Sequence, residues 1–244
     1  MIAPPVAPPP AVLPADRVAA AFEVILCSGF PTQLIVIAAL GALGMHPRSA
    51  DGGLDGPFVF TLTLLDTVLL VSLIAVFFRS HRESFREQLF GTHSQAREMV
   101  LGLALIPASF FLVVLVLGLL LVLAPGLRNV LHNPLIDLVK TRLDAFVFAF
   151  VVMIAGGVRE EIQRGFVLRR FEQYLGGGAV GLVLFSVLFG LGHVEQGYDV
   201  SIATAALGAF WGFIYLRRRS ILAPIIGHAG FNLAQVAKFL VLGV

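Results

Sequence analysis

Seven long apolar segments divide this chain, and they constrain its fold more than any other feature of the sequence. A helix needs about 20 mostly apolar residues to cross a membrane, because lipid offers no hydrogen-bond partners to unpaired backbone groups. The chain is 58% hydrophobic and 13% charged, whereas about a quarter of the residues in a soluble domain are charged. We therefore predict an all-α fold, a polytopic bundle of transmembrane helices. The predicted spans are residues 20–45, 57–78, 99–124, 143–168, 179–193, 200–216 and 221–244.

A single membrane domain accounts for almost the whole chain. The first 17 residues, MIAPPVAPPPAVLPADR, are rich in proline, which favours an extended and solvated tail. They lack the basic stretch and the following apolar stretch of a signal peptide. We predict a flexible tail at 1–17 and a helical membrane domain at 18–244. Two spans, 179–193 and 200–216, are short, so a count of six or eight also fits.

Arginines gather in three clusters near the ends of the predicted spans, and these clusters set the predicted orientation. Lys and Arg collect on the cytoplasmic side of membrane helices. With seven spans, all three clusters and the N-terminus fall on one side, so we predict a cytoplasmic N-terminus. We expect an integral protein of a bacterial plasma membrane, with membrane lipid as a partner. We expect no nucleic acid partner, because the net charge is only +2. The clusters are Arg79, Arg82, Arg86 and Arg97; Arg159, Arg164, Arg169 and Arg170; and Arg217, Arg218 and Arg219.

Polar side chains inside three predicted spans point to a buried site. Charged groups in lipid are costly, and they persist where they face a cavity or a partner. Counted at 1.5 Å per residue from the nearest basic cluster or glycine turn, Glu160 lies about 14 Å deep, His193 at most about 22 Å, and His228 about 13 Å. Asn232 lies one turn beyond His228. The overlapping depths predict that these four side chains meet.

Helical spacing predicts which neighbours lie beside these side chains. Arg164 follows Glu160 by four residues and Glu161 by three, so it can pair with a glutamate on its own helix face. Adjacent residues point about 100° apart, so only one of the two glutamates can face a given point. Phe189 precedes His193 by four residues and can pack beneath its imidazole. These spacings place Glu161, Arg164 and Phe189 next to the predicted site.

These residue types suit the hydrolysis of an amide bond. A desolvated glutamate such as Glu160 can act as a general base on water, and His193 can orient that water or carry a proton. His228 and Asn232, four residues apart, can donate hydrogen bonds to a developing oxyanion. Alternatively, Glu160, His193 and His228 hold a divalent metal such as zinc and leave one position for water. The sequence leaves both the metal-dependent and the metal-independent mechanism open.

Three motifs, taken in order, resemble those of a known protease family. The stretches are EEIQR at 160–164, FGLGH at 189–193 and HAGFN at 228–232. The second and third fit the patterns FxxxH and HxxxN of the CPBP intramembrane proteases, the group of CAAX proteases and bacteriocin-processing enzymes that is also called Abi. The first resembles their EExxxR pattern, with one residue fewer before the arginine. The resemblance is strongest from 153 to 232 and defines a CPBP-like core at about 143–236.

The resemblance implies an intramembrane endopeptidase similar to CAAX prenyl protease 2, of a metallo- or a glutamate type. Glu160 and His193 would activate water, while His228 and Asn232 would contact the oxyanion or a metal. The substrate would be a membrane-anchored protein or peptide. The supporting residues would be Glu161, Arg164 and Phe189.

Two other functions fit the same polar groups. A non-catalytic scaffold or immunity protein would bind a partner in the cavity, and it would keep its function without Glu160. A transporter would use buried carboxylates as ion sites, and Glu23 and Asp66 lie in other spans where they could join such a path. Each of these two carboxylates fits better as a helix-packing residue that is bonded to a neighbour.

Overall fold

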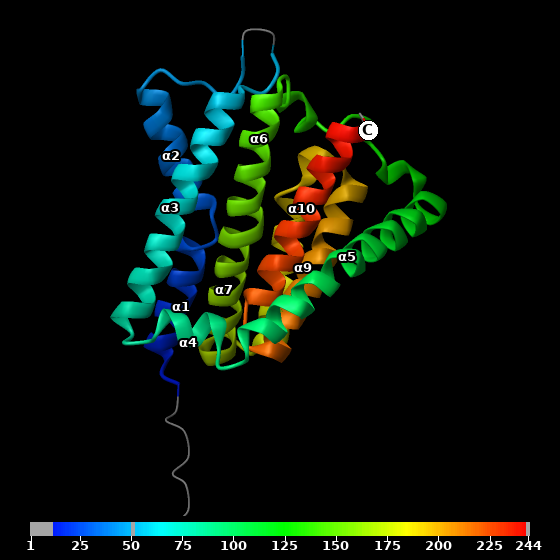
Figure 1. Ribbon diagram of the computed structural model, residues 1–244. Helices are drawn as coiled ribbons and strands as arrows, with labels where there is room; N and C mark the ends of the chain where they lie inside the picture. Colours follow the sequence, from blue (N-terminus) through cyan, green and yellow to red (C-terminus); the bar gives the residue numbers. More distant parts are fainter. Residues whose placement is uncertain (1–11, 50–51, 243–244) are drawn as a thin grey trace, which may run out of the picture.

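The computed structural model describes residues 12–49 and 52–242, and the regular elements in this part of the chain are helices (Figure 1). This confirms the predicted all-α fold. The first helix begins at Pro14, inside the predicted tail 1–17. Proline is tolerated in a first helical turn, because its missing N–H would have no partner there. Residues 1–11 of the predicted tail lie outside the described residues.

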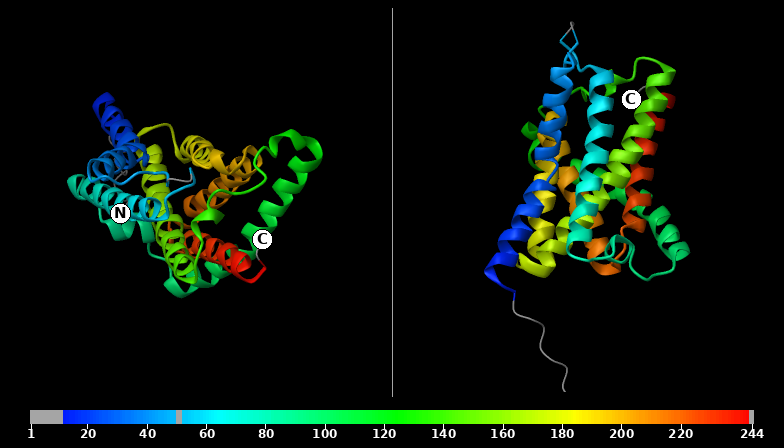
Figure 2. Two further views of the ribbon diagram at one scale, coloured as in Figure 1. Left: turned by 90° about the horizontal axis from the view of Figure 1, so that it is seen from above. Right: turned by 90° about the vertical axis from the view of Figure 1, so that its left-hand side faces the viewer.

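Most helices follow one another through short links. The exceptions are the link 43–55 between α2 and α3 and a longer irregular stretch at 124–141 that holds only two short 3₁₀ turns. In chain order the described helices are α1 (Pro14–Leu26), α2 (Phe30–Ala42), α3 (Gly56–Ser80), α4 (Phe85–Phe90), α5 (Gln95–Leu123), α6 (Arg142–Val151), α7 (Glu160–Tyr174), α8 (Gly178–Leu191), α9 (Tyr198–Arg218) and α10 (Leu222–Leu242). The short turns are η1 (Pro125–Leu127), η2 (Ile136–Leu138) and η4 (Val194–Gln196). Most long helices run side by side, whereas α5 leans away from the bundle towards its C-terminal end (Figures 1 and 2).

Within the described residues, the helices α3, α5 and α9 are each long and apolar enough to cross a membrane. The pair α1 and α2, bent by 42° at its break, makes a fourth if it counts as one span, and the apolar helix α8 is shorter. The side chains of Phe111, Val114 and Val122 on α5 are 71%, 69% and 79% exposed, as lipid-facing residues are. These helices fit an integral membrane protein, and the count of seven spans stays a prediction.

One continuous run of helix crosses the middle of the bundle and changes type half-way. α6 continues into a π-helix, η3 (Val152–Arg159), which continues into α7 (Figure 1). π-helical turns are rare and occur frequently at functional sites. Their wider turn changes the direction in which the following residues point. The first residue after η3 is Glu160, so the predicted catalytic glutamate follows directly on an irregular turn.

Small residues let the helices around this run approach closely. A Cβ atom on Gly157 of η3 would lie 2.5 Å from the Cβ of Ala229 on α10. A Cβ atom on Gly190 of α8 would lie 2.7 Å from the Cβ of Ala205 on α9. Real Cβ atoms do not approach so closely, so both contacts depend on glycine. They bring the three helices that carry the predicted motifs, together with α9, around one centre.

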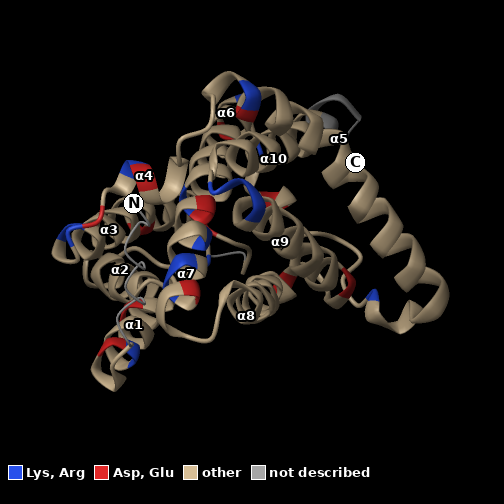
Figure 3. Ribbon diagram, turned by 90° about the horizontal axis from the view of Figure 1, so that it is seen from below, with Lys and Arg blue, Asp and Glu red and all other residues tan. Residues whose placement is uncertain are grey.

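The basic clusters lie at one end of the bundle, the lower end in Figure 1, where Figure 3 shows basic residues beside α4 and α7. Arg170, near the end of α7, donates a 2.6 Å hydrogen bond to Glu83 in the link between α3 and α4. Two members of the second predicted cluster, Arg159 and Arg164, are exceptions, because they lie further along the helical run, buried inside the bundle. The shared end agrees with the predicted arrangement of the spans, while the compartment that it faces stays a prediction.

The two carboxylates considered for an ion path are bonded to neighbouring helices. Glu23 accepts a 2.6 Å hydrogen bond from Arg170 and lies 2.5 Å from the Nε2 atom of His81. Asp66 accepts a 2.5 Å hydrogen bond from Arg159. Neither carboxylate lines the cavity at the predicted site. This confirms the helix-packing interpretation and gives the transporter no support.

Candidate active site

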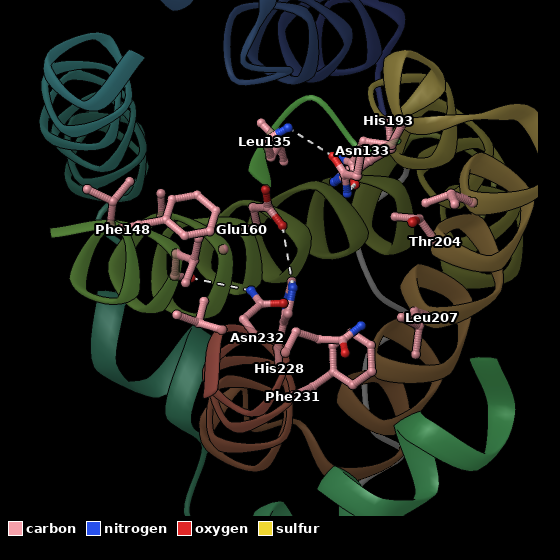
Figure 4. Close-up of a pocket in the computed structure, with 18 of the residues that line it drawn as sticks. Asn133, Leu135, Phe148, Glu160, His193, Thr204, Leu207, His228, Phe231 and Asn232 are labelled. Atoms are coloured by element: carbon pink, nitrogen blue, oxygen red, sulfur yellow. Dashed lines mark hydrogen bonds and ion pairs between the residues drawn. The ribbon is translucent and has the colours of Figure 1, made fainter. Parts of the chain in front are cut away.

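A cavity of about 520 Å³ lies inside the bundle, beside η3, the C-terminal end of α8, the N-terminal part of α9 and the middle of α10 (Figure 4). Glu160, His193, His228 and Asn232 all line it. These residues come from three helical regions that are far apart in the sequence. The structure therefore brings together the four side chains whose depths predicted that they would meet. Their catalytic roles stay predictions.

His228 is held in place on two sides. Its Nδ1 atom lies 2.8 Å from the Oε1 atom of Glu161, and its ring stacks on Trp211 with a centroid separation of 3.8 Å and an angle of 19°. Because a carboxylate only accepts hydrogen bonds, the Nδ1 atom must carry a hydrogen. The Nε2 atom then faces the cavity side, where it lies 3.8 Å from the Oε2 atom of Glu160.

The two adjacent glutamates have different surroundings. The side chain of Glu161 is 1% exposed and forms an ion pair with Arg164, which is equally buried. The guanidinium of Arg164 also lies 4.8 Å from the ring centre of Phe189. The alternative pairing of Arg164 with Glu160 is wrong, because the turn directs Glu160 to the cavity and Glu161 to the arginine. Of the three predicted supporting residues, Glu161 and Arg164 thus lie behind the site, whereas Phe189 lines the cavity.

Glu160 is the carboxylate that faces the cavity. Its side chain is 18% exposed, and its two oxygens face different groups. Oε1 lies 4.0 Å from the Nη1 atom of Arg159, and Oε2 lies 3.8 Å from the Nε2 atom of His228. Both separations exceed a hydrogen bond, so neither oxygen is occupied by these neighbours. A water molecule or a peptide group can therefore bind to this carboxylate.

His193 lies at the end of α8, on the opposite side of the cavity from α10 (Figure 4). Its Nδ1 atom lies 2.8 Å from the carbonyl oxygen of Phe189, so this nitrogen must donate a hydrogen. The ring of Phe189 packs against the imidazole with a centroid separation of 4.9 Å, as predicted. The Nε2 atom of neutral His193 is then a hydrogen-bond acceptor, which suits a group that orients water or takes up a proton.

Asn232 lies against the π-helix. Its side-chain amide donates a 3.3 Å hydrogen bond to the carbonyl oxygen of Val152, the first residue of η3. A Cβ atom on Gly156 would overlap that amide nitrogen, so the position of Asn232 depends on this glycine. Asn232 and His228 share a face of α10, one turn apart. The motif HAGFN thus fixes two polar groups on one wall of the cavity.

The side chains as placed do not form a metal-ligand set. Among the residues that the structure describes, no three His, Cys, Asp or Glu side chains stand close enough to hold one ion. Two ligands of a tetrahedral zinc ion, each about 2.1 Å from the metal, lie roughly 3.4 Å apart. Glu160 and His228 are separated by 3.8 Å, and His193 does not join them. The metal site that Glu160, His193 and His228 would form stays a prediction, and we assign no chemical step to it.

The structure adds polar residues to the cavity that the sequence did not single out. Asn133, in the irregular stretch after α5, donates a 3.2 Å hydrogen bond to Gln196 of η4, and both line the cavity. Gln196 follows His193 by three residues, so its spacing could have predicted that it lies on the same side of the turn. Asn133 carried no such signal, because its contact joins segments that are 63 residues apart. The remaining polar lining residues are Thr63, Thr204 and Gln235.

Comparison with known proteins supports the interpretation of the motifs. Residues 142–234 match the family described as type II CAAX prenyl endopeptidase, Rce1-like. No curated protein and no solved structure matches the chain. The matched segment runs from the start of α6 into α10 and contains every predicted site residue. This chain therefore carries an Rce1-like domain at 142–234, which confirms the family that the three motifs predicted.

Proposed function

We propose that this protein is an intramembrane endopeptidase that hydrolyses a peptide bond in a membrane-associated protein or peptide. The Rce1-like domain supports a CAAX-type intramembrane protease in general. One observation carries the finer proposal: a carboxylate, two imidazoles and a carboxamide from three motifs line a single cavity inside the bundle. A scaffold would need a cavity, but it would not need this combination of hydrolytic groups.

In the proposed reaction, Glu160 is the general base. A water molecule bound between Glu160 and the Nε2 atom of His193 gives a proton to the carboxylate while its oxygen attacks the carbonyl carbon of the scissile bond. The carbonyl oxygen becomes an oxyanion, which accepts a hydrogen bond from the amide of Asn232. The protonated Glu160 then gives its proton to the leaving amine, so that one water is consumed and an acid and an amine are formed.

His228 acts from the same wall as Asn232. The Glu161 carboxylate keeps a hydrogen on the Nδ1 atom of His228. When the imidazole also carries a proton on Nε2, it can donate a hydrogen bond to the oxyanion. Stacking on Trp211 restricts the rotation of the ring, so the donor keeps its direction. Such preorganised donors contribute more to catalysis than mobile ones, because they need no reorganisation during the reaction.

The test uses purified protein in liposomes with lipid-anchored reporter peptides, one series prenylated at a CAAX tail and one acylated. We expect Glu160→Gln and His193→Ala to lower kcat by about 10²-fold or more, the usual loss of a general base. Glu195→Gln is the matched control, because Glu195 follows His193 closely but its side chain is exposed. Unchanged cleavage in both site variants would refute the assignment. The two peptide series decide which anchor the substrate carries.

The same preparation separates the two mechanisms. A metal-dependent site with Glu160, His193 and His228 as ligands predicts that a chelator abolishes cleavage and that added zinc restores it. The metal-independent mechanism above predicts that cleavage survives the chelator. Metal analysis of the purified protein provides the independent measurement.

A further inference from the structure

Arg159 and Asp66 form a buried ion pair beside the cavity, and the proposed reaction does not use it. The Nη2 atom of Arg159 donates a 2.5 Å hydrogen bond to the Oδ2 atom of Asp66. The two side chains are 10% and 3% exposed. Asp66 belongs to α3, outside the Rce1-like domain, whereas Arg159 is the last residue of η3. The pair thus connects a helix outside the matched domain to the residue that precedes Glu160.

Stability alone does not account for this pair. Burying two charges costs free energy that their attraction recovers only when the geometry is excellent and the remaining polar atoms are satisfied. Here the Oδ1 atom of Asp66 and the Nε atom of Arg159 are buried without a hydrogen-bond partner. Two apolar residues would pack α3 against η3 at a lower cost. The charges therefore have a role in addition to the attachment of the two helices.

The position of the Arg159 guanidinium indicates the additional role of this ion pair. Arg159 lies between two carboxylates, because its Nη2 atom binds Asp66 while its Nη1 atom lies 4.0 Å from the Oε1 atom of Glu160. The other oxygen of Glu160 faces His228 at 3.8 Å. One side of the catalytic carboxylate thus faces an anchored cation, and the other side faces the imidazole. Because Asp66 fixes the position of the Arg159 cation, Asp66 also influences the position of Glu160 through Arg159.

We propose that Asp66 and Arg159 are positioning residues for the catalytic base. Asp66 holds Arg159 on α3, and the charge of Arg159 attracts the Oε1 atom of Glu160 across 4.0 Å, without a hydrogen bond, so that the Oε2 atom stays towards His228 and the cavity. This inference rests on the proposed function, since it concerns the same reaction. It adds a part of the chain outside the matched domain to the catalytic apparatus.

A second buried ion pair on the same helical run offers a matched control. Arg170 of α7 is fully buried and donates a 2.6 Å hydrogen bond to Glu23 of α1. Like Asp66, Glu23 is a buried carboxylate on a helix that precedes the matched domain. Arg170 lies 11 residues beyond Arg159, about 16 Å along the helix, so its pair does not reach the cavity. Arg170 also bonds Glu83, so the two pairs are compared through the kcat of folded variants, which a purely structural role would leave unchanged in both.

The experiment compares Asp66→Asn with Glu23→Gln in the liposome assay, with wild type and Glu160→Gln in the same series. We expect Asp66→Asn to lower kcat by about tenfold or more, because small misplacements of a catalytic group are costly, while KM changes less than about threefold. We expect Glu23→Gln to keep kcat within about twofold of wild type. Both variants are compared for thermal unfolding in detergent, so that a loss of fold is not read as a loss of positioning.

If the Asp66→Asn variant does not fold, a second comparison tests the positioning role. Arg159→Met has a similar volume but no charge, and Arg159→Lys keeps a cation at the same place. We expect the lysine variant to retain kcat within about threefold and the methionine variant to lose about tenfold or more. The proposal is overturned if Asp66→Asn keeps full kcat, if Glu23→Gln loses as much, or if the lysine and methionine variants behave alike. A wild type without Glu160-dependent cleavage would instead overturn the proposed function itself.

Discussion

Glu160 and Glu161 are neighbours in the chain, yet each forms a different part of the site. Successive residues of a helix point about 100° apart, so one glutamate faces the cavity while the other faces Arg164 and His228. The sequence predicted this division but not its assignment. Spacing allowed Arg164 to pair with either glutamate, and the choice depended on the direction in which the preceding π-helix turns the chain. That direction is a tertiary property, and no local pattern encodes it.

The division predicts opposite effects of two conservative substitutions. Glu161→Gln removes the anion beside Arg164, and the guanidinium is then buried without a counter-ion, which we expect to lower the free energy of unfolding by about 3 kcal/mol or more. Glu160→Gln removes the base, and the Glu160 carboxylate makes no hydrogen bond with Arg159 or His228, so we expect stability to change by less than about 1 kcal/mol while cleavage is lost. Denaturant unfolding in detergent and the liposome assay measure both quantities. Glu160→Gln proving the more destabilising of the two would contradict this division.

At the scale of elements, η3 joins α6 to α7 in one continuous helical run. It shapes the site because its wider turn sets the direction of Glu160, the residue that follows it. The sequence predicts one long span at 143–168, and the structure has a continuous helical run there, but nothing in the residues 152–159 predicts i→i+5 hydrogen bonding. At the start of the π-helix, α10 lies close enough for Asn232 to donate a hydrogen bond to the carbonyl of Val152, a tertiary contact that no local pattern encodes. The pairing of Asp66 with Arg159 was missed for the same reason, since the two residues are 93 positions apart.

The contact between η3 and α10 can be tested through its glycine. Gly157→Ala would place a methyl group 2.5 Å from the Cβ of Ala229 and push α10 away. We expect a loss of about 1–3 kcal/mol in stability and about tenfold or more in kcat, because α10 carries His228 and Asn232. Gly41→Ala in α2 is the control, since no atom lies within 4 Å of its added methyl group. Equal activity of the two variants would show that this close approach does not shape the site.

At the scale of the whole molecule, the two ends of the bundle differ. One end is joined by ion pairs, such as Arg170 with Glu83 and Arg218 with Glu98. At the other end, the stretch 124–141 and η4 contribute residues to the lining of the cavity, beside those from the helices. The basic clusters do not reach this end. The sequence predicted the shared end from its arginines. It did not predict that the opposite loops line the cavity, because their polar residues follow no periodic pattern.

The position of Glu160 inside the bundle has a consequence for any substrate that arrives as a helix. In an α-helix each backbone carbonyl accepts a hydrogen bond from the N–H four residues further on, and side chains surround it. A substrate must therefore unwind locally before Glu160 and Asn232 can reach the carbonyl of its scissile bond. We expect peptides with a Gly-Gly pair beside the scissile bond to be cleaved about tenfold faster than Ala-Ala peptides of equal anchoring, since two glycines weaken a helix by about 2 kcal/mol. Equal rates in a direct competition assay would mean that unwinding does not limit cleavage. If unwinding does limit the cleavage rate, the substrates of this protein are selected by how readily they lose secondary structure. Substrate residues that never contact the protein then help to determine which bond is cut.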